Sequence, residues 1–188
     1  MTRIVAGQAK GRRLAVPAKG TRPTSERARE ALFSSLAGLV DINGARVLDL
    51  FAGSGAVGLE ALSRGARTVD FVDSDRTACD VLNRNIAAVG LAGTQVHRRA
   101  AATFLVGAGT DEPFDVVFAD PPYALGEPQL QALLATLCTP QWLSPSAVVV
   151  VERSARGVEP TWPDDRHGLE QVKQKRYGEG MLWYGRRR

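Results

Sequence analysis

VLDLFAGSGAVG, residues 47–58, joins a short apolar run to three glycines in the spacing G-x-G-x-x-G. An apolar run of this length is typical of a buried strand, and the segment that follows the glycines is predicted to be a helix. Glycines at such a turn let a nucleotide-type cofactor approach the backbone and the start of the helix. The segment therefore predicts an α/β fold with a cofactor site that comprises Phe51, Ala52, Gly53, Ser54 and Gly55.

Short apolar runs alternate with helical stretches from residue 46 onward, which is typical of a parallel sheet covered by helices. The predicted strands are residues 47–51, 68–72, 95–98, 114–119 and 147–151. The predicted helices are residues 57–64, 76–89, 100–106 and 128–137. Residues 153–167 are predicted to form a loop, and residues 171–176 and 181–184 a closing antiparallel hairpin.

The first 40 residues are predicted to form a small extension of the main domain. Residues 3–6 and 12–16 flank a glycine-containing loop and indicate a β-hairpin. A helix is then expected to begin at Thr24 or Ser25, because either side chain can cap it. With 188 residues the chain is long enough for one sizeable core. We therefore predict an N-terminal extension at residues 1–40 and a catalytic domain at residues 41–188.

Charge divides unevenly along the chain. Residues 1–40 carry eight Lys and Arg against two acidic residues, residues 41–150 carry seven against twelve, and residues 151–188 carry nine against six. The net charges of these three parts are thus +6, −5 and +3. Basic ends on an acidic body suggest a polyanionic partner, although charge alone fits solvated surface equally well.

The composition also weighs against several classes of protein. No stretch reaches the roughly 18 apolar residues of a membrane span, and the first residues lack the apolar core of a secretory signal, so we expect a cytoplasmic protein with no membrane partner. Cys79, Cys138, His97 and His167 have no metal-ligand spacing. We predict that both cysteines are buried structural thiols and that the protein has no metal site. Nothing in the sequence resembles a dimer interface, so we also predict a monomer.

Two carboxylates are predicted to select the cofactor. Asp73, with Ser74 after it, ends the second predicted strand and can accept hydrogen bonds from both hydroxyls of a ribose. NAD and S-adenosylmethionine both fit this feature. Asp49, four residues before Gly53, would repel a pyrophosphate but suits the ammonium and sulfonium charges of S-adenosylmethionine. The sequence therefore favours S-adenosylmethionine.

DPPY, residues 120–123, follows the apolar run 114–119 directly. An exocyclic amino group on a base is a poor nucleophile because its lone pair is delocalised into the ring. Asp120 and the backbone carbonyl of Pro121 can accept its two hydrogens and turn the lone pair toward a methyl group. Pro121 and Pro122 restrict the backbone of this segment, and Tyr123 offers a ring on which a base can stack.

These two motifs together predict an amino-nitrogen methyltransferase but leave the amino group open. Guanine N2, adenine N6, cytosine N4 and a glutamine side chain all fit. An enzyme acting on DNA adenine or on protein glutamine is therefore an alternative. An NAD-binding oxidoreductase would leave Asp49 and DPPY without a role, and a non-catalytic RNA-binding module would explain only the basic extension.

The whole chain resembles the RsmD family of bacterial methyltransferases. The resemblance is carried by RIVAG (3–7), GRRL (11–14), RPT (22–24), RAREALF (27–33), LDLFAGSG (48–55), GLEALSRG (58–65), DR (75–76), DPPY (120–123) and YG (177–178). The glycine and DPPY motifs are common to many methyltransferases, whereas RPT and GLEALSRG are much more particular.

The resemblance implies a class I, Rossmann-like methyltransferase sheet and S-adenosylmethionine as donor. It implies methylation of guanine N2 at a guanine-966 type site in 16S ribosomal RNA, within the small ribosomal subunit. It also implies that the N-terminal hairpin helps to hold RNA through its basic residues, Arg3, Lys10, Arg12, Arg13, Arg22 and Arg27. Alternatively, Arg22 and Arg27 pair with nearby acidic side chains and fix the extension in place.

The chain departs from the family pattern in two places. Where relatives often carry Asp or Asn before Ala101 to bind the adenine amino group, this chain has Ala100. Adenine recognition is then expected to use backbone groups near Ala101 and apolar packing. Asp73 stands where relatives commonly have Glu.

Overall fold

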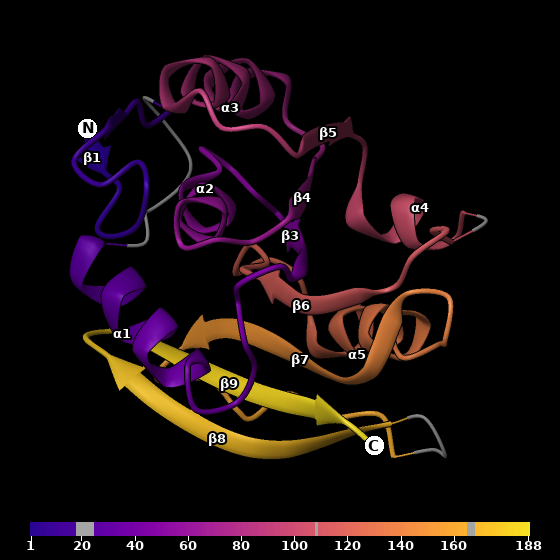
Figure 1. The fold of residues 1–188 in the computed structure, drawn as a ribbon. Helices are drawn as coiled ribbons and strands as arrows, with labels where there is room; N and C mark the ends of the chain where they lie inside the picture. The colour runs from indigo at the N-terminus through magenta and orange to yellow at the C-terminus, as the bar shows by residue number, and fades with distance from the viewer. Residues whose placement is uncertain (18–24, 108, 165–167) are drawn as a thin grey trace.

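The computed structural model describes residues 1–17, 25–107, 109–164 and 168–188 (Figure 1). Arg22, Thr24 and His167, which the sequence analysis singled out, lie outside the described residues.

Seven strands form one sheet, which confirms the predicted α/β class. Their bounds are β3 (Arg46–Leu50), β4 (Thr68–Asp73), β5 (Thr94–Arg98), β6 (Phe114–Ala119), β7 (Leu143–Ser154), β8 (Leu169–Tyr177) and β9 (Gly180–Arg187). Their order in the sheet is β5-β4-β3-β6-β7-β9-β8. The first five in this order run parallel, and β9 runs antiparallel to both β7 and β8.

Five helices accompany the sheet in the described part of the chain. Their bounds are α1 (Glu26–Leu36), α2 (Ala56–Ser63), α3 (Arg76–Val89), α4 (Ala101–Leu105) and α5 (Glu127–Leu137). Helices α1, α2 and α3 cover one face and α4 and α5 the other (Figure 1). No helix among the described residues has both the length and the apolar character that crossing a membrane requires.

The two cores show how strand alternation separates the faces. Val47, Val69 and Phe118 pack on the side of α1 to α3, whereas Leu48, Leu50 and other strand residues pack against α4 and α5. Successive side chains of a strand point to opposite faces, so a strand buried on both sides has a continuous apolar run. This is why the strands were evident in the sequence.

The four helices predicted in the body lie within one residue of their predicted bounds, but the C-terminal strands are longer than predicted. Strand β7 begins at Leu143 and ends at Ser154, inside the segment predicted as a loop. Its last residues pair with β9, from Glu152 opposite Leu182 to Ser154 opposite Gly180. Backbone pairing of this kind extends a strand through polar residues, which an apolar pattern does not reveal.

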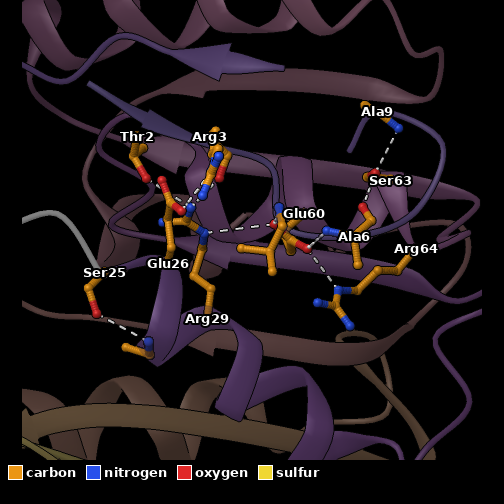
Figure 2. Close-up of polar contacts among 12 residues, drawn as sticks. Thr2, Arg3, Ala6, Ala9, Ser25, Glu26, Arg29, Glu60, Ser63 and Arg64 are labelled. Atoms are coloured by element: carbon orange, nitrogen blue, oxygen red, sulfur yellow. Dashed lines mark hydrogen bonds and ion pairs between the residues drawn. The ribbon is translucent and has the colours of Figure 1, made fainter. Parts of the chain in front are cut away.

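The predicted N-terminal hairpin is present but short, with β1 (Thr2–Arg3) paired to β2 (Arg13–Leu14). The strands are shorter than predicted because the following backbone binds α2 instead of a neighbouring strand. Val5 and Ala6 donate their N–H groups to the Glu60 carboxylate at 2.8 and 3.0 Å. Farther along the loop, Ala9 N–H donates to Ser63 Oγ at 2.9 Å (Figure 2).

Glu60 is the buried anion on which this docking depends. Its side chain is completely buried and also pairs with Arg64 Nε at 2.9 Å and Arg29 Nε at 3.9 Å (Figure 2). Arg29, equally buried on α1, donates from Nη2 to Thr2 Oγ1 at 3.0 Å and to the Arg3 carbonyl at 2.6 Å. One carboxylate therefore joins the hairpin, α1 and α2.

The substitution Glu60→Ala is expected to lower the free energy of unfolding by about 3–5 kcal/mol, because it breaks a fully buried ion pair with Arg29. Urea denaturation followed by circular dichroism measures the change. The control Glu112→Ala removes a largely exposed carboxylate that pairs with Arg67 at 2.5 Å, and it should cost about 0–1 kcal/mol. Equal losses in the two variants would contradict the role of Glu60.

Candidate active site

The carboxyl ends of β4, β3 and β6 meet at one edge of the sheet. Leu50, at the end of β3, is in register with Val72 on one side and Ala119 on the other. The chain leaves β3 toward β4 first and returns to β6 on its other side, so this edge contains a topological switch point. Ligands of doubly wound sheets bind at such points. The predicted glycine turn, Asp73 and Asp120 are thus brought together.

The turn after β3 has an unusual backbone. Phe51 has a positive φ of 61°, in a region that side chains larger than glycine rarely adopt, and Gly53 follows with a φ of 56°. A Cβ atom added to Gly53 would come no nearer than 4.0 Å to its closest neighbour, the Phe51 carbonyl. The Gly53 side of the turn is therefore open to a ligand.

The other two glycines serve packing. A Cβ atom on Gly55, whose φ is 75°, would lie 2.2 Å from a Leu82 methyl group, and one on Gly58 would lie 2.4 Å from the Phe71 ring. Both distances are far below van der Waals contact. Gly55 and Gly58 hence let α2 pack closely on β4 and α3, whereas Gly53 leaves room for a cofactor.

Asp73 connects the end of β4 to the glycine turn. Its Oδ2 accepts the Gly53 N–H at 2.8 Å and its Oδ1 accepts the Asp75 N–H at 2.9 Å. Each carboxylate oxygen has more than one lone pair, so the group can still accept from ribose hydroxyls as predicted. Ser74, the next predicted contact, is exposed beside it.

Asp49 is a buried carboxyl directly below the turn, with only 4% of its surface exposed. Its Oδ2 accepts the Gly58 N–H at 2.9 Å. Burial raises the pKa of Asp49 to about 8, and nearby Asp120 and Asp73 add to the rise while the Gly58 hydrogen bond opposes it. A cation at this place would stabilise the ionised form. The ammonium and sulfonium groups of S-adenosylmethionine meet this requirement, so the residues present fit the cofactor.

Asp120 directly follows β6 and retains solvent-exposed surface. Burial among the surrounding protein atoms is the largest cause that raises its pKa, to about 7; Glu152 adds to the rise and Arg153 opposes it. Solvent on the exposed side of Asp120 screens these charges, so we use only the direction of the pKa change, which is upward. The carboxyl of Asp120 is thus easier to protonate than an ordinary aspartate.

The rest of DPPY forms a turn between β6 and α5. Pro121 is buried, and Tyr123 is 72% exposed, so its ring is available for stacking. The turn is closed by a hydrogen bond from Leu125 N–H to the Pro122 carbonyl at 2.8 Å. Arg153 Nη2 donates to the Leu125 carbonyl at 3.0 Å and ties the turn to β7.

Glu152 and Arg153 also lie at this site but were not predicted from the sequence. Arg153 was placed in a loop, and Glu152 was not considered. A signal was present, because residues 147–151 are a continuous apolar run and the two charged residues follow it at the carboxyl end of the strand. In such sheets, the residues at the carboxyl ends of the parallel strands are the ones that contact ligands.

The predicted adenine contact follows β5. Ala100 is the N-cap residue of α4 and provides no side-chain cap, while Ala101 is buried. Asp73 is in register with Arg98 on β5, so the segment after Arg98 leaves the sheet at the same edge as the carboxylates. Adenine recognition by backbone and apolar groups there stays a prediction.

Of the basic residues predicted to bind RNA, the five that the structure describes are exposed, namely Arg3, Lys10, Arg12, Arg13 and Arg27. Arg3 pairs with Glu26 at 2.9 Å, and Arg12 donates to the Ala88 carbonyl of α3 at 2.9 Å. Arg3, Lys10 and Arg27 also line a cavity of about 410 Å³ shared with Glu26 and Glu30. RNA contact by these residues stays a prediction.

The part of the chain that the structure describes contains no cluster suited to a metal ion, since no three His, Cys, Asp or Glu side chains there are grouped to hold one. Cys79 and Cys138 are both buried, as predicted.

This strand order, with a glycine turn after β3 and an acidic residue at the end of β4, defines a class I methyltransferase. The methyl donor of this class is S-adenosylmethionine, as predicted. A family model described as Conserved hypothetical protein 95 matches residues 2–186. The chain belongs to this family, which confirms the resemblance to RsmD-type proteins.

Relatives of known name agree with the class. The chain is 41% identical to ribosomal RNA small subunit methyltransferase D of Escherichia coli K12 over 162 residues, which cover 86% of this chain and 79% of that protein. It is 38% identical to the protein of the same name from Haemophilus influenzae, over 80% of this chain and 77% of that protein. A solved structure of a hypothetical protein from Thermus thermophilus superimposes with a TM-score of 0.80 and 34% identity, over 98% of both chains.

The pKa of Asp49 predicts a pH dependence of stability. Because its folded-state pKa of about 8 lies above the unfolded value, the native state binds the extra proton, and stability falls as pH rises from roughly 4 through 8. Asp49→Asn removes this contribution, so its unfolding free energy should fall less between pH 5 and pH 9 than that of the wild type. The limit for one proton is about tenfold in the folding equilibrium constant per pH unit.

Urea denaturation at several pH values measures both slopes. Asp80→Asn, at an exposed acid on α3, is the matched control and should retain the wild-type slope. A wild-type slope in the Asp49→Asn variant would show that Asp49 is ionised throughout this range.

Proposed function

We propose that this protein transfers a methyl group from S-adenosylmethionine to the exocyclic N2 of a specific guanine in 16S ribosomal RNA of the small subunit. The observation that carries the proposal is the position of Asp120 and the exposed Tyr123 at the same sheet edge as the glycine turn, Asp49 and Asp73. The names of the Escherichia coli and Haemophilus influenzae relatives support ribosomal RNA as the substrate.

The cofactor would be held by residues of the turn and by two carboxylates. Asp73 would accept from the ribose hydroxyls, Gly53 would admit the ligand to the backbone, and Asp49 would face its positive charge. S-adenosylmethionine supplies an electrophilic methyl group and leaves as a neutral thioether.

Asp120 would accept a hydrogen bond from the target amino group while the Pro121 carbonyl accepts from the other hydrogen. These two acceptors draw the nitrogen lone pair out of conjugation with the ring. When the new carbon–nitrogen bond forms, the nitrogen must give up one proton. Asp120 would take it, since its pKa is raised above that of an ordinary aspartate, toward the range that suits a general base.

The base would reach the site from an unpaired or extruded nucleotide, because an amino group within a stacked helix is not accessible. The exposed ring of Tyr123 would stack on it, which is worth about 1–3 kcal/mol in single-stranded complexes. Residues 1–40 would form an RNA-binding extension that holds the surrounding strand through phosphate contacts.

Incubation with tritiated S-adenosylmethionine and unmodified small subunits or their RNA, followed by nucleoside analysis, tests the assignment. We expect labelled N2-methylguanosine. Asp120→Ala should lower the rate by about 10² to 10⁴, the usual contribution of a positioned proton acceptor, while cofactor binding persists. Asp111→Ala, at an exposed acid before β6, is the control and should keep full activity.

Label in N6-methyladenosine would favour an adenine methyltransferase, and transfer to a protein glutamine would favour the other alternative. Undiminished transfer by Asp120→Ala would contradict the catalytic role of DPPY in any of these enzymes.

The salt dependence of RNA binding tests the basic extension. Six phosphate contacts predict a log–log slope of about −4 for single-stranded RNA, and each lost contact should reduce its magnitude by about 0.7. Arg13→Ala should show this reduction in filter-binding titrations at several salt concentrations. The control is Arg67→Ala. Arg67 is an exposed arginine that immediately precedes β4 and pairs with Glu112, so this variant should keep the wild-type slope. If neither substitution changes the slope, Arg13 does not contact the RNA.

A further inference from the structure

Two acidic residues occupy neighbouring positions at the carboxyl edge of the sheet, one directly after β6 and one in β7. Phe118 is in register with Val150 and Ala119 with Val151, so the same register continued by one residue sets Asp120 opposite Glu152. Phe118 and Val150 both pack into the core on the side of α1 to α3. Side chains alternate along each strand, so Asp120 and Glu152 point to that same side.

The electrostatics agree with this placement. Among charged neighbours, Glu152 has the largest effect on Asp120, and it acts against ionisation. Arg153, the next residue of β7, alternates to the other face, where it donates to the Leu125 carbonyl. Asp49 is a third acidic group close enough to interact with Asp120. Adjacent carboxylates each disfavour the ionisation of the other, and a donor or cation that approaches them opposes this effect.

The Glu152 carboxylate lies near the carboxyl edge of the sheet. Glu152 is half-buried and pairs with Leu182 on β9. A Cβ atom on Gly180, two residues before Leu182, would lie 3.0 Å from Glu152 Oε1. The absence of a side chain at Gly180 thus provides the space in which this oxygen lies, on the β9 side of β7, whereas Asp120 is on the β6 side.

We propose that Glu152 determines the specificity for guanine by accepting a hydrogen bond from N1–H of the target base while Asp120 accepts from its N2 amino group. This inference rests on the proposed function. The Watson–Crick edge of guanine presents N1–H and the N2 amino group as adjacent donors, and carboxylates offer only acceptors. Two neighbouring carboxylates therefore match two neighbouring donors.

The same arrangement would reject adenine. The N1 atom of adenine is an acceptor, and it would place a lone pair against the Glu152 carboxylate. Enzymes that read a substrate N–H with a polar side chain discriminate strongly against analogues that lack this donor, because the hydrogen bond is then lost. Asp120 alone could not make this distinction, since adenine also carries an amino group.

The base 2,6-diaminopurine separates recognition from chemistry. It keeps the N2 amino group that receives the methyl group, but its N1 is an acceptor. Small-subunit RNA ligated from fragments would carry either guanine or 2,6-diaminopurine at the methylated position. The measured quantity is the ratio of kcat/KM for the two RNAs, compared among wild type, Glu152→Gln, Glu152→Asp and the control Glu170→Gln on β8.

We expect the wild type to prefer guanine by about tenfold to a hundredfold, the usual range for reading one base edge. Glu152→Gln should reduce this preference at least fivefold, because its amide can donate to N1 of 2,6-diaminopurine. Glu152→Asp keeps the acceptor and Glu170→Gln lies at an exposed position, so both should retain the preference. 2,6-Diaminopurine also differs from guanine at position 6, where an amino group replaces the carbonyl oxygen. This difference is the same for every variant. The change in the guanine preference from one variant to the next is therefore what assigns the contact to Glu152.

The inference is overturned if the wild type methylates both RNAs equally, or if Glu152→Gln lowers both rates in the same proportion, as a purely structural role would. Should Glu152→Gln fail to fold by circular dichroism, Glu152→Ala takes its place, and an unchanged preference for guanine in that variant would also overturn the inference. Methylation of guanine N2 with an unchanged ratio would refute only the role of Glu152. Absence of N2-methylguanosine from the wild-type reaction would refute the proposed function itself.

Discussion

The gathering of carboxylates at one edge of the sheet is the constraint that organises this molecule. Asp49, Asp73, Asp120 and Glu152 come from four strands whose order brings their carboxyl ends together. Burial and mutual repulsion raise the pKa values of Asp49 and Asp120 to about 8 and about 7. A site of this kind is unfavourable alone and becomes favourable with a cation and hydrogen-bond donors. A sulfonium cofactor and an aromatic amine supply both.

Helix α2 connects this acidic edge to the N-terminal extension. It begins directly after the glycine turn, and the N–H of its residue Gly58 donates to Asp49. Two residues later Glu60 binds the hairpin backbone and Arg29 on α1. One eight-residue helix thus fixes both the cofactor turn and the extension.

Sequence patterns predicted most of this architecture because strands buried on both faces are continuously apolar. The predicted bounds 114–119 and 76–89 are the same as those observed for β6 and α3. The glycine turn, Asp49, Asp73 and Asp120 were found through their positions in or after such strands. Glu152 was overlooked although it follows the predicted strand 147–151 as Asp120 follows 114–119; what no local pattern contains is its pairing with β9, which continues β7 through it.

Other features depend on contacts between distant parts of the chain, which no local pattern contains. Glu60 looks in the sequence like an ordinary helix acid, yet it is completely buried because the hairpin lies over it. Gly55 and Gly58 fit a nucleotide-binding motif, but their space is limited by Leu82 and Phe71. The positive φ of Phe51 likewise cannot be recognised from a residue type that usually avoids it.

The faces of the sheet suggest how RNA would approach. Asp120 and Glu152 point to the side covered by α1 and α2, and the hairpin is fixed to those same two helices. The exposed Tyr123 lies instead in the turn that leads to α5 on the opposite side. A base inserted over the edge would then meet acceptors from one face and a stacking ring from the other. Its flanking phosphates would fall on the hairpin side, where the exposed arginines lie.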